Sequence, residues 1–290
     1  MNFVSRYMKT RKILAAALVL AGLCVSAAVA VAGAGESGTL KVISMNIRNG
    51  EANDGTNSWQ YRCPASLLMI NELKPDILGL QEAYYYQVLF LTENLRDYKA
   101  AGVGREDGKK DGEHMSILYN RKTVSLKKWG TFWLSETPDE PSVGWDAACK
   151  RTATWAIMKD RRTGNSFLYV NTHLDHVGKQ AQEKGLALIM DRIAELNTSG
   201  LPVILTGDFN VKPGDPVLDR LDNMMRSARI YAEKTDSHAT YNNWGKSSDI
   251  IDYIYYSGFR SCPEFRTVTQ KFGEWPFISD HYPVEAVLGF

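Results

Sequence analysis

One pattern constrains the fold of this chain more than any other: short apolar segments typical of strands recur, and five of them lie next to a polar side chain. Four of these segments are "VISMN", "LGLQE", "LYVNTH" and "LTGDFN", and in the fifth Asp280 and His281 precede "YPVEAV". Apolar strands are anchored in a core, so polar residues at their ends are held rigidly at the rim of a sheet. The sequence therefore predicts one site built from several strands.

Strand-like and helix-like segments alternate along the chain, which indicates the α/β or α+β class. The segments "HMSILY", "TATWAIM" and "IIDYIYY" add further strand candidates. We expect a helix over residues 179–196, where apolar side chains recur at helical spacing, and a second helix that opens at Pro64 and ends before Pro75. No repeat or linker interrupts this order, and 290 residues with 44% apolar content suit one domain.

The first 34 residues have the pattern of a signal peptide. Four basic residues precede an uncharged stretch that runs from residue 13 to 34 and contains small residues suited to cleavage. We expect cleavage and export, either to a periplasm or out of the cell, which leaves a catalytic domain over residues 35–290. The alternative is a retained membrane anchor, because residues 13–32 are just long enough to span a bilayer.

Charge and cysteine content limit the function further. Without its first 34 residues the chain has 30 Lys and Arg against 33 Asp and Glu, a net charge of −3. This balance weakens the hypothesis of a nuclease that grips long nucleic acid through a basic face. Cys63, Cys149 and Cys262 remain in this part, either as one disulfide and one thiol or as three buried thiols.

The polar residues beside the strands suit metal-assisted hydrolysis of a phosphate ester. Carboxylates crowded in one cleft repel one another unless a cation neutralises them, and hard oxygen ligands favour Mg²⁺, Mn²⁺ or Ca²⁺. Such a cation, together with an imidazole, suits the attack of water on a phosphate ester. A zinc hydrolase is disfavoured, because the chain has five His and no "HExxH".

Seven segments in a fixed order resemble the motifs of the endonuclease/exonuclease/phosphatase superfamily: "ISMNIRNG", "LGLQEA", "GEHMSILY", "NTHLDH", "LTGDFNVKPGDP", "IIDYIY" and "SDHYPV". They span residues 40–288, and the amino-acid sequence of one loop resembles that of the secreted bacterial branch of this superfamily. The resemblance implies a four-layer α/β (α+β) sandwich, in which two mixed β-sheets pack face to face and helices flank them. It also implies a Mg²⁺- or Mn²⁺-dependent phosphoesterase.

The resemblance assigns the metal and the attacking water to two groups of residues. Glu82 is implied as the metal ligand, with Asn46 beside it and Asp280 approaching the same site. Asp208 and Asn210 are implied to position the water and the phosphate.

The resemblance also implies an acidic partner for each of two histidines. Glu113 is implied to orient His173, which donates to a phosphate oxygen. Asp252 is implied to hydrogen-bond His281 and to keep its ring charged, because a carboxylate partner raises the pKa of an imidazole.

Loops around this rim are expected to determine the substrate. Arg105 and Arg151 are candidates for contacts with phosphate, with ordinary solvated charge as the alternative for Arg105, and Trp145 is a candidate for stacking on a base or sugar. We expect His114 and His176 at the surface.

We expect a secreted phosphoesterase that hydrolyses a phosphodiester or phosphomonoester. Its partner is a phosphorylated substrate, either a small molecule or a short nucleic acid. We expect a monomer without a membrane partner once the signal is removed. The alternative is a non-catalytic extracellular protein that binds a phosphorylated or carbohydrate ligand, although such a protein does not need the two acid–imidazole pairs.

Overall fold

The structure is a computed structural model and describes residues 38–290. The predicted signal peptide, residues 1–34, lies outside the described residues. Within residues 38–290, no helix has the length and apolar character needed to cross a membrane.

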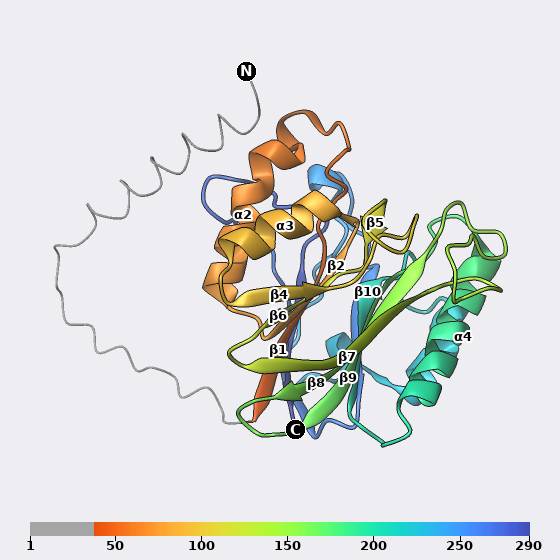
Figure 1. Cartoon of the computed structure of the whole chain (residues 1–290). Helices are drawn as coiled ribbons and strands as arrows, with labels where there is room; N and C mark the ends of the chain where they lie inside the picture. Colours follow the sequence, from red (N-terminus) through yellow and green to blue (C-terminus); the bar gives the residue numbers. More distant parts are fainter. Residues whose placement is uncertain (1–37) are drawn as a thin grey trace, which may run out of the picture. The chain divides into compact units, whose positions relative to one another are not determined.

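Two six-stranded sheets form the centre of the described chain (Figure 1). The first sheet has the order β13-β14-β1-β2-β6-β4, with bounds β1 (Thr39–Asn46), β2 (Ile77–Gln81), β4 (Tyr98–Ala101), β6 (Ile117–Asn120), β13 (Ser261–Thr267) and β14 (Val284–Gly289). The second has the order β11-β12-β10-β9-β8-β7, with bounds β7 (Val124–Trp133), β8 (Thr152–Asp160), β9 (Ser166–His173), β10 (Val203–Asp208), β11 (Arg226–Ser227) and β12 (Asp252–Ser257). A small ribbon joins β3 (Ala83–Tyr84) and β5 (Glu113–His114).

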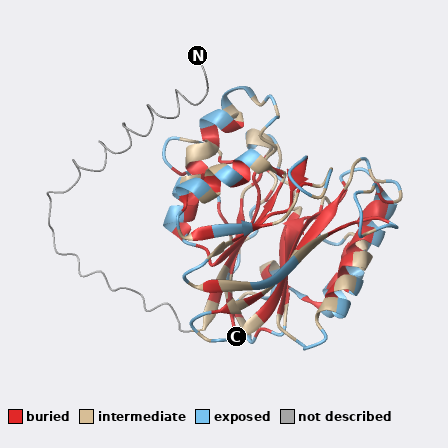
Figure 2. Cartoon of the chain, in the orientation of Figure 1, coloured by how far each residue is buried: buried red, intermediate tan, exposed pale blue. Residues whose placement is uncertain are grey.

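Helices cover the outer faces of both sheets. The helices are α2 (Trp59–Leu73), α3 (Tyr85–Asn94), α4 (Lys179–Leu196), α5 (Asp219–Met224) and α6 (Ala228–Tyr231), and short 3-10 turns lie at Gly55–Asn57, Pro216–Leu218 and Asn243–Gly245. One apolar cluster fills the space between the sheets, a second lies under α2 and α3, and a third lies under α4 and α5. The helices are buried on the side that faces a sheet and exposed outside (Figure 2). The predicted four-layer sandwich with two mixed sheets is confirmed.

Each sheet contains one parallel strand pair, and these pairs position the polar residues. In the first sheet β1 runs parallel to β2, with Asn46 opposite Gln81. In the second sheet β9 runs parallel to β10, with His173 opposite Asp208, and antiparallel β12 places Asp252 opposite Asp208 on the other side. The carboxyl ends of parallel strands meet at one edge of a sheet, which is where open α/β sheets bind ligands.

A buried polar layer lies between the apolar core and this edge. Gln81 donates to Asn171 Oδ1 (2.7 Å), which also accepts from the Thr206 hydroxyl (3.1 Å). A methyl group at Gly79 would lie 2.5 Å from Asn171 Oδ1 and 2.7 Å from Thr206 Oγ1. Glycine at position 79 therefore makes the close approach of the two sheets possible.

The expected helix over 179–196 is α4, but the prediction that a helix opens at Pro64 was wrong. Helix α2 begins five residues earlier, so Pro64 lies inside it. Buried Trp59 and Arg62 extend the packed face of the helix toward its start. Packing of these side chains offsets the backbone hydrogen bond that the proline ring cannot donate.

Candidate active site

Asn46 joins the two sheets at the centre of the site. Its amide nitrogen donates to Glu82 Oε1 (2.9 Å) in the first half of the site and to Asp208 Oδ2 (3.0 Å) in the second half. Asn46 is fully buried, and its Oδ1 accepts from the backbone N–H of Arg48 (2.9 Å). One amide therefore fixes the spacing between a carboxylate of each sheet.

Asp208 is the central residue of the half of the site that lies on the second sheet. Its Oδ1 accepts from the backbone N–H of Asn210 (3.0 Å), and its Oδ2 lies 3.4 Å from His173 Nε2 and 3.7 Å from His281 Nε2. Burial, reinforced by the negative charge of Asp252, raises the pKa of Asp208 to about 7. A carboxyl that titrates near neutral pH is suited to accept a proton there.

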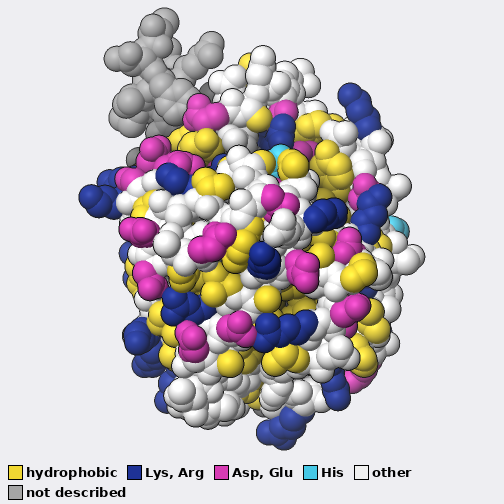
Figure 3. All heavy atoms as spheres, turned by 90° about the vertical axis from the view of Figure 1, so that its right-hand side faces the viewer, with side chains coloured by type: hydrophobic (Ala, Val, Ile, Leu, Met, Phe, Trp, Pro, Cys, Tyr) yellow, Lys and Arg dark blue, Asp and Glu magenta, His cyan; other side chains and the backbone are white. Residues whose placement is uncertain are grey.

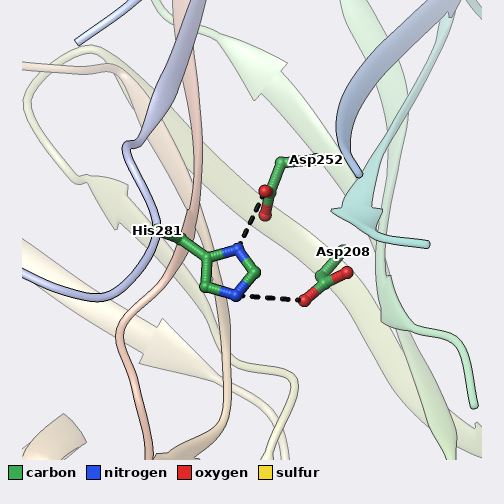
Figure 4. A group of neighbouring side chains, drawn as sticks. All are labelled: Asp208, Asp252 and His281. Carbon is green, nitrogen blue, oxygen red and sulfur yellow. Dashed lines mark hydrogen bonds and ion pairs between the residues drawn. The ribbon is translucent and has the colours of Figure 1, made fainter. Parts of the chain in front are cut away.

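His281 lies between two carboxylates (Figure 4). Its Nδ1 is 2.9 Å from Asp252 Oδ2, so the predicted contact between these residues is confirmed. Burial alone would lower the pKa of His281, but Asp252 and Asp208 outweigh it and raise this pKa to about 10. The imidazole is therefore cationic at neutral pH. The Tyr241 ring packs against it, with 4.8 Å between ring centroids.

Glu82 and Asp280 form the other half of the site, in which Asp280 is buried and Glu82 is partly exposed. Glu82 Oε2 accepts from the backbone N–H of Asn49 (2.8 Å), and Asp280 Oδ2 lies 3.6 Å from Arg48 Nε. Burial raises the pKa of Asp280, and the negative charge of Glu82 contributes to the rise. In contrast, the pKa of Glu82 is lowered, because hydrogen bonds and nearby cations outweigh its burial.

These residues fit a divalent cation. The negative charge of Glu82 raises the pKa of Asp280 although Arg48 is paired with Asp280, so a cation between the two carboxylates would relieve their repulsion. Oxygen donors of this kind suit Mg²⁺ or Mn²⁺. Asp208, Asp252 and His281 also place one ligand atom each within 4.8 Å of the others, but cationic His281 already neutralises that group.

Backbone strain marks the same region. Arg48, Glu82 and Asn210 have φ angles of 60°, 61° and 53°, in the left-handed region that non-glycine residues rarely adopt. Such conformations cost energy and tend to occur where a binding or catalytic site requires them.

The predicted pair of Glu113 and His173 is wrong. Glu113 Oε2 binds Arg105 Nη1 (2.5 Å), and within residues 38–290 the buried Nδ1 of His173 has no hydrogen-bond partner. Asn210 donates one amide hydrogen to Leu174 O (3.0 Å) and faces His173 Nε2 (2.9 Å). Burial, with the nearby charges of Arg151 and Arg105, lowers the pKa of His173 well below its usual value. A neutral ring whose Nε2 faces an amide donor does not support the expected donation to a phosphate oxygen.

The residues predicted to contact substrate are engaged with the protein. Arg105 pairs with Glu113, and Arg151 is buried with its Nε 3.3 Å from Asp175 Oδ2. Trp145 is half-buried against the cluster under α4, with Lys184 Nζ 6.0 Å from its ring.

The histidines outside the site differ from one another. His176 is exposed, as expected. The expectation that His114 lies at the surface was wrong: it is buried and stacks on Tyr85, with 5.8 Å between ring centroids. Its position in the β3–β5 ribbon turns its side chain inward.

Two arginines that support the site have no strong sequence signal. Arg48 follows Asn46 by two residues and lies against Asp54 and Asp280. Arg62 is buried in α2 and donates to four backbone carbonyls, those of Ile47, Arg48, Asn57 and Ile278. A helical arginine usually indicates a solvated face, so the pattern of α2 does not identify this role.

The fold and the site together define a class of protein: an α/β sandwich with acidic and imidazole groups gathered at the carboxyl ends of its two parallel strand pairs. The profile described as Endonuclease/Exonuclease/phosphatase family matches residues 45–281. The chain belongs to this family, whose homologues are hydrolases of phosphoester bonds.

Solved structures from this family are similar to the chain. The mannosyl-6-phosphatase Bt3783 of Bacteroides thetaiotaomicron has a TM-score of 0.81 and 33% identity, covering 87% of this chain and 100% of that one. A family protein of Bacteroides vulgatus has the same TM-score and identity, covering 87% and 99%. An uncharacterized protein of Acanthamoeba polyphaga mimivirus is 24% identical over 274 residues, 86% of this chain and 100% of that protein.

Proposed function

We propose that this protein is a divalent-metal-dependent phosphatase that removes phosphate from a small, sugar-sized phosphomonoester. The observation that carries the proposal is the hydrogen-bonded series from Glu82 through Asn46 to Asp208, completed by cationic His281. This series supports the proposal of an acidic cation site beside a proton acceptor and a fixed positive charge. The similarity to a mannosyl-6-phosphatase over the full length of that protein supports a monoester of a sugar.

The residues of the second half carry the chemistry. Asp208 orients a water molecule for in-line attack and accepts its proton, for which a pKa of about 7 is suited. His281 stabilises the negative charge that develops on the phosphate oxygens, and Asp252 keeps it protonated. His173 faces the side-chain amide of Asn210 and so fixes Asn210 beside Asp208. Glu82, with Asn46 and Asp280 nearby, would hold a Mg²⁺ or Mn²⁺ ion, which would supply further neutralisation of phosphate charge.

Charge balance favours a small substrate over a long nucleic acid. Acidic and basic side chains are interspersed on the face that carries α4 (Figure 3). The chain after residue 34 has a net charge of −3, whereas proteins that bind long nucleic acids usually gather basic residues on one face. We also propose, from the signal-peptide pattern of residues 1–34, that the enzyme is exported. A separate proposal is that it acts as a monomer.

The test is hydrolysis by the purified protein, with Mg²⁺, Mn²⁺ or EDTA, of two monoesters, mannose 6-phosphate and p-nitrophenyl phosphate, and of three diester substrates, bis-p-nitrophenyl phosphate, DNA and RNA. Release of phosphate is measured for the monoesters, release of p-nitrophenol for bis-p-nitrophenyl phosphate, and release of acid-soluble nucleotides for DNA and RNA. We expect turnover of the sugar phosphate that EDTA abolishes and that Asp208→Asn lowers by about a thousandfold. The matched control is Asp219→Asn, an exposed residue of α5. Turnover of diesters or nucleic acids alone would contradict the proposed substrate class, and activity retained by Asp208→Asn would remove Asp208 from the mechanism.

A further inference from the structure

A second hollow lies behind the ribbon that carries Glu113. It has a volume of about 350 Å³, within the range of small-molecule sites. Adjacent side chains of a strand point to opposite faces, so Glu113 of β5 faces the candidate active site while His114 lines the hollow. We name this hollow the α3–β5 pocket. Its apolar wall is formed by Val88, Leu89 and Ala100, and its polar wall by Lys109, Lys110 and His114.

The polar wall carries two lysines, and Asp107 of the same loop acts on one of them, Lys109, through its negative charge. Within the described chain neither Lys109 nor Lys110 forms an ion pair, whereas Arg105 of the same loop is paired with Glu113. Lys110 Nζ lies 4.6 Å from the centroid of the Tyr85 ring. The loop that carries both lysines is held in shape by hydrogen bonds in which the backbone N–H groups of Lys109 and Asp111 donate to the Asp107 carboxylate. Two ammonium groups at one opening favour an anion.

His114 adds a buried hydrogen-bond acceptor. Its Nε2 lies 3.3 Å from the carbonyl of Lys110, which can only accept, so Nε2 carries the proton. Burial lowers the pKa of His114, so the ring is neutral and Nδ1 is left with a lone pair. No described residue hydrogen-bonds to this Nδ1. A neutral imidazole nitrogen of this kind can accept a hydrogen bond from a hydroxyl group, but it cannot donate one to an anion.

We propose that the α3–β5 pocket is a second binding site for a sugar-sized, hydroxylated organic anion, such as a sugar acid or sugar phosphate. Lys109 and Lys110 bind the acidic group, His114 Nδ1 accepts a ligand hydroxyl, and Val88, Leu89 and Ala100 cover the apolar face of the ring. The Tyr85 ring holds Lys110 and His114 in place. This site is separate from the cleft of Asp208 and does not depend on the proposed phosphatase activity.

The experiment is calorimetric titration of the full-length Asp208→Asn protein with glucuronate, glucose 6-phosphate, glucose and cyclohexanecarboxylate. Cyclohexanecarboxylate has a similar ring and acid but no hydroxyls. We expect one or both sugar anions to bind, and to bind at least about tenfold more weakly to Lys109→Met/Lys110→Met, a change equal to about 1.4 kcal/mol. The matched control is Lys127→Met/Lys128→Met, which removes two exposed lysines from β7.

A second variant tests the histidine. His114→Phe keeps the stack on Tyr85 but removes the acceptor, so glucuronate should lose its advantage over cyclohexanecarboxylate. Stronger binding of glucuronate than of glucose 6-phosphate identifies the acid as a carboxylate, and the reverse identifies a phosphate. The proposal is overturned by equal binding of cyclohexanecarboxylate to the unmodified pocket, by binding that the lysine pair does not affect, or by no binding of either sugar anion.

Discussion

At the scale of single residues, the site depends on how each carboxylate is compensated. Asp252 has His281, Glu113 has Arg105, and Asp280 has Arg48, which it shares with Asp54. Asp208 has two imidazoles nearby, of which only His281 is charged. Glu82 has no ion-pair partner of its own within the described chain, and in the proposed mechanism the proton is accepted by Asp208.

The pairing of Asp252 with His281 predicts a change in pH dependence. Asp252 is the strongest of the groups that raise the pKa of His281, to about 10, and the proposed mechanism uses the protonated ring. In Asp252→Asn this pKa falls, so activity should be lost at a lower pH as the pH rises. The measurement is the profile of kcat/KM against pH between about 6 and 10. An alkaline limb at the same pH in both proteins would show that His281 is not the group that titrates.

Some residues of the site could be predicted from sequence and others could not. Asn46, Glu82, Asp208 and His281 follow or precede strands, and strand ends are readable from apolar patterns. The partner of Glu113 could not be predicted in this way. Arg105 contacts Glu113 from the loop before β5, and the conformation of a loop does not follow from the spacing of apolar residues. The burial of His114 depends on the same loop.

At the scale of elements, Arg62 of α2 connects the segments that carry the site. It binds the carbonyls of Ile47 and Arg48, which follow β1, and that of Ile278, which precedes Asp280. Its guanidinium lies 5.2 Å from the Trp59 ring centroid and 5.7 Å from that of Trp244. Helix α2 thereby fixes the segment that follows β1 against the segment that precedes Asp280.

Replacement of Arg62 should therefore affect stability and activity together. Arg62→Met leaves buried carbonyls without donors, and we expect a loss of about 3 kcal/mol in the free energy of unfolding. Arg62→Lys keeps part of the binding, so it should fold but show a lower kcat and require more Mg²⁺. Denaturant unfolding and metal titration measure the two effects, with exposed Arg96→Met as control. An unchanged metal requirement in Arg62→Lys would limit Arg62 to a role in stability.

A second link joins the sheets at their opposite ends. Arg162 Nη2 binds Asp160 Oδ2 (2.6 Å) at the end of β8 and Asp76 Oδ2 (3.0 Å) beside β2. Burial would raise the pKa of Asp160, but hydrogen bonds from Arg162 and Thr163 outweigh it and lower this pKa. The link therefore stabilises the fold only when Asp160 is ionised.

This link predicts a stability difference that depends on pH. A lowered pKa in the folded state gives stability above the unfolded value of 3.8, and this stability is lost as the pH falls through the folded value. Asp160→Asn should lose about 2 kcal/mol at pH 7, and the difference from wild type should shrink below about pH 4. Urea unfolding at several pH values tests this, with Asp219→Asn as control. A constant difference at all pH values would rule out the charge of Asp160 as its cause.

The elements that the sequence did not predict have physical explanations. β7 is an edge strand with exposed Lys127, Lys128 and Trp129 and a shift in register after Leu126, so alternation is lost. α3 begins with aromatic residues typical of strands, and at its start the Gln87 side chain accepts from the backbone N–H of Tyr84 (3.0 Å). Neither feature has the pattern from which strands and helices are usually predicted.

At the scale of the whole molecule, residues 38–290 are held together by the three apolar clusters, and no disulfide links any part of this range. Cys63, Cys149 and Cys262 are free thiols, so of the two alternatives that the sequence left open the disulfide is not formed. Cys262 is buried, and the other two are half-buried.

A reducing agent should therefore leave thermal stability unchanged. We expect the melting temperature with and without dithiothreitol to agree within about 1 °C, because a disulfide would stabilise by constraining the unfolded chain. Differential scanning calorimetry measures this, and thiol titration of the unfolded protein provides the control. A lower melting temperature in dithiothreitol would show that two cysteines pair in solution.

The pairing of β1 with β14 has a consequence for biosynthesis. Thr39 lies opposite Gly289, so the first strand of the described chain completes its hydrogen bonds only with the last one. Asp280 and His281 are translated just before β14. A nascent chain that lacks the segment from Asp280 to the end of β14 therefore has neither a closed sheet nor the imidazolium cation. The site can assemble only after this segment has left the ribosome, although Asn46 and Glu82 are translated much earlier.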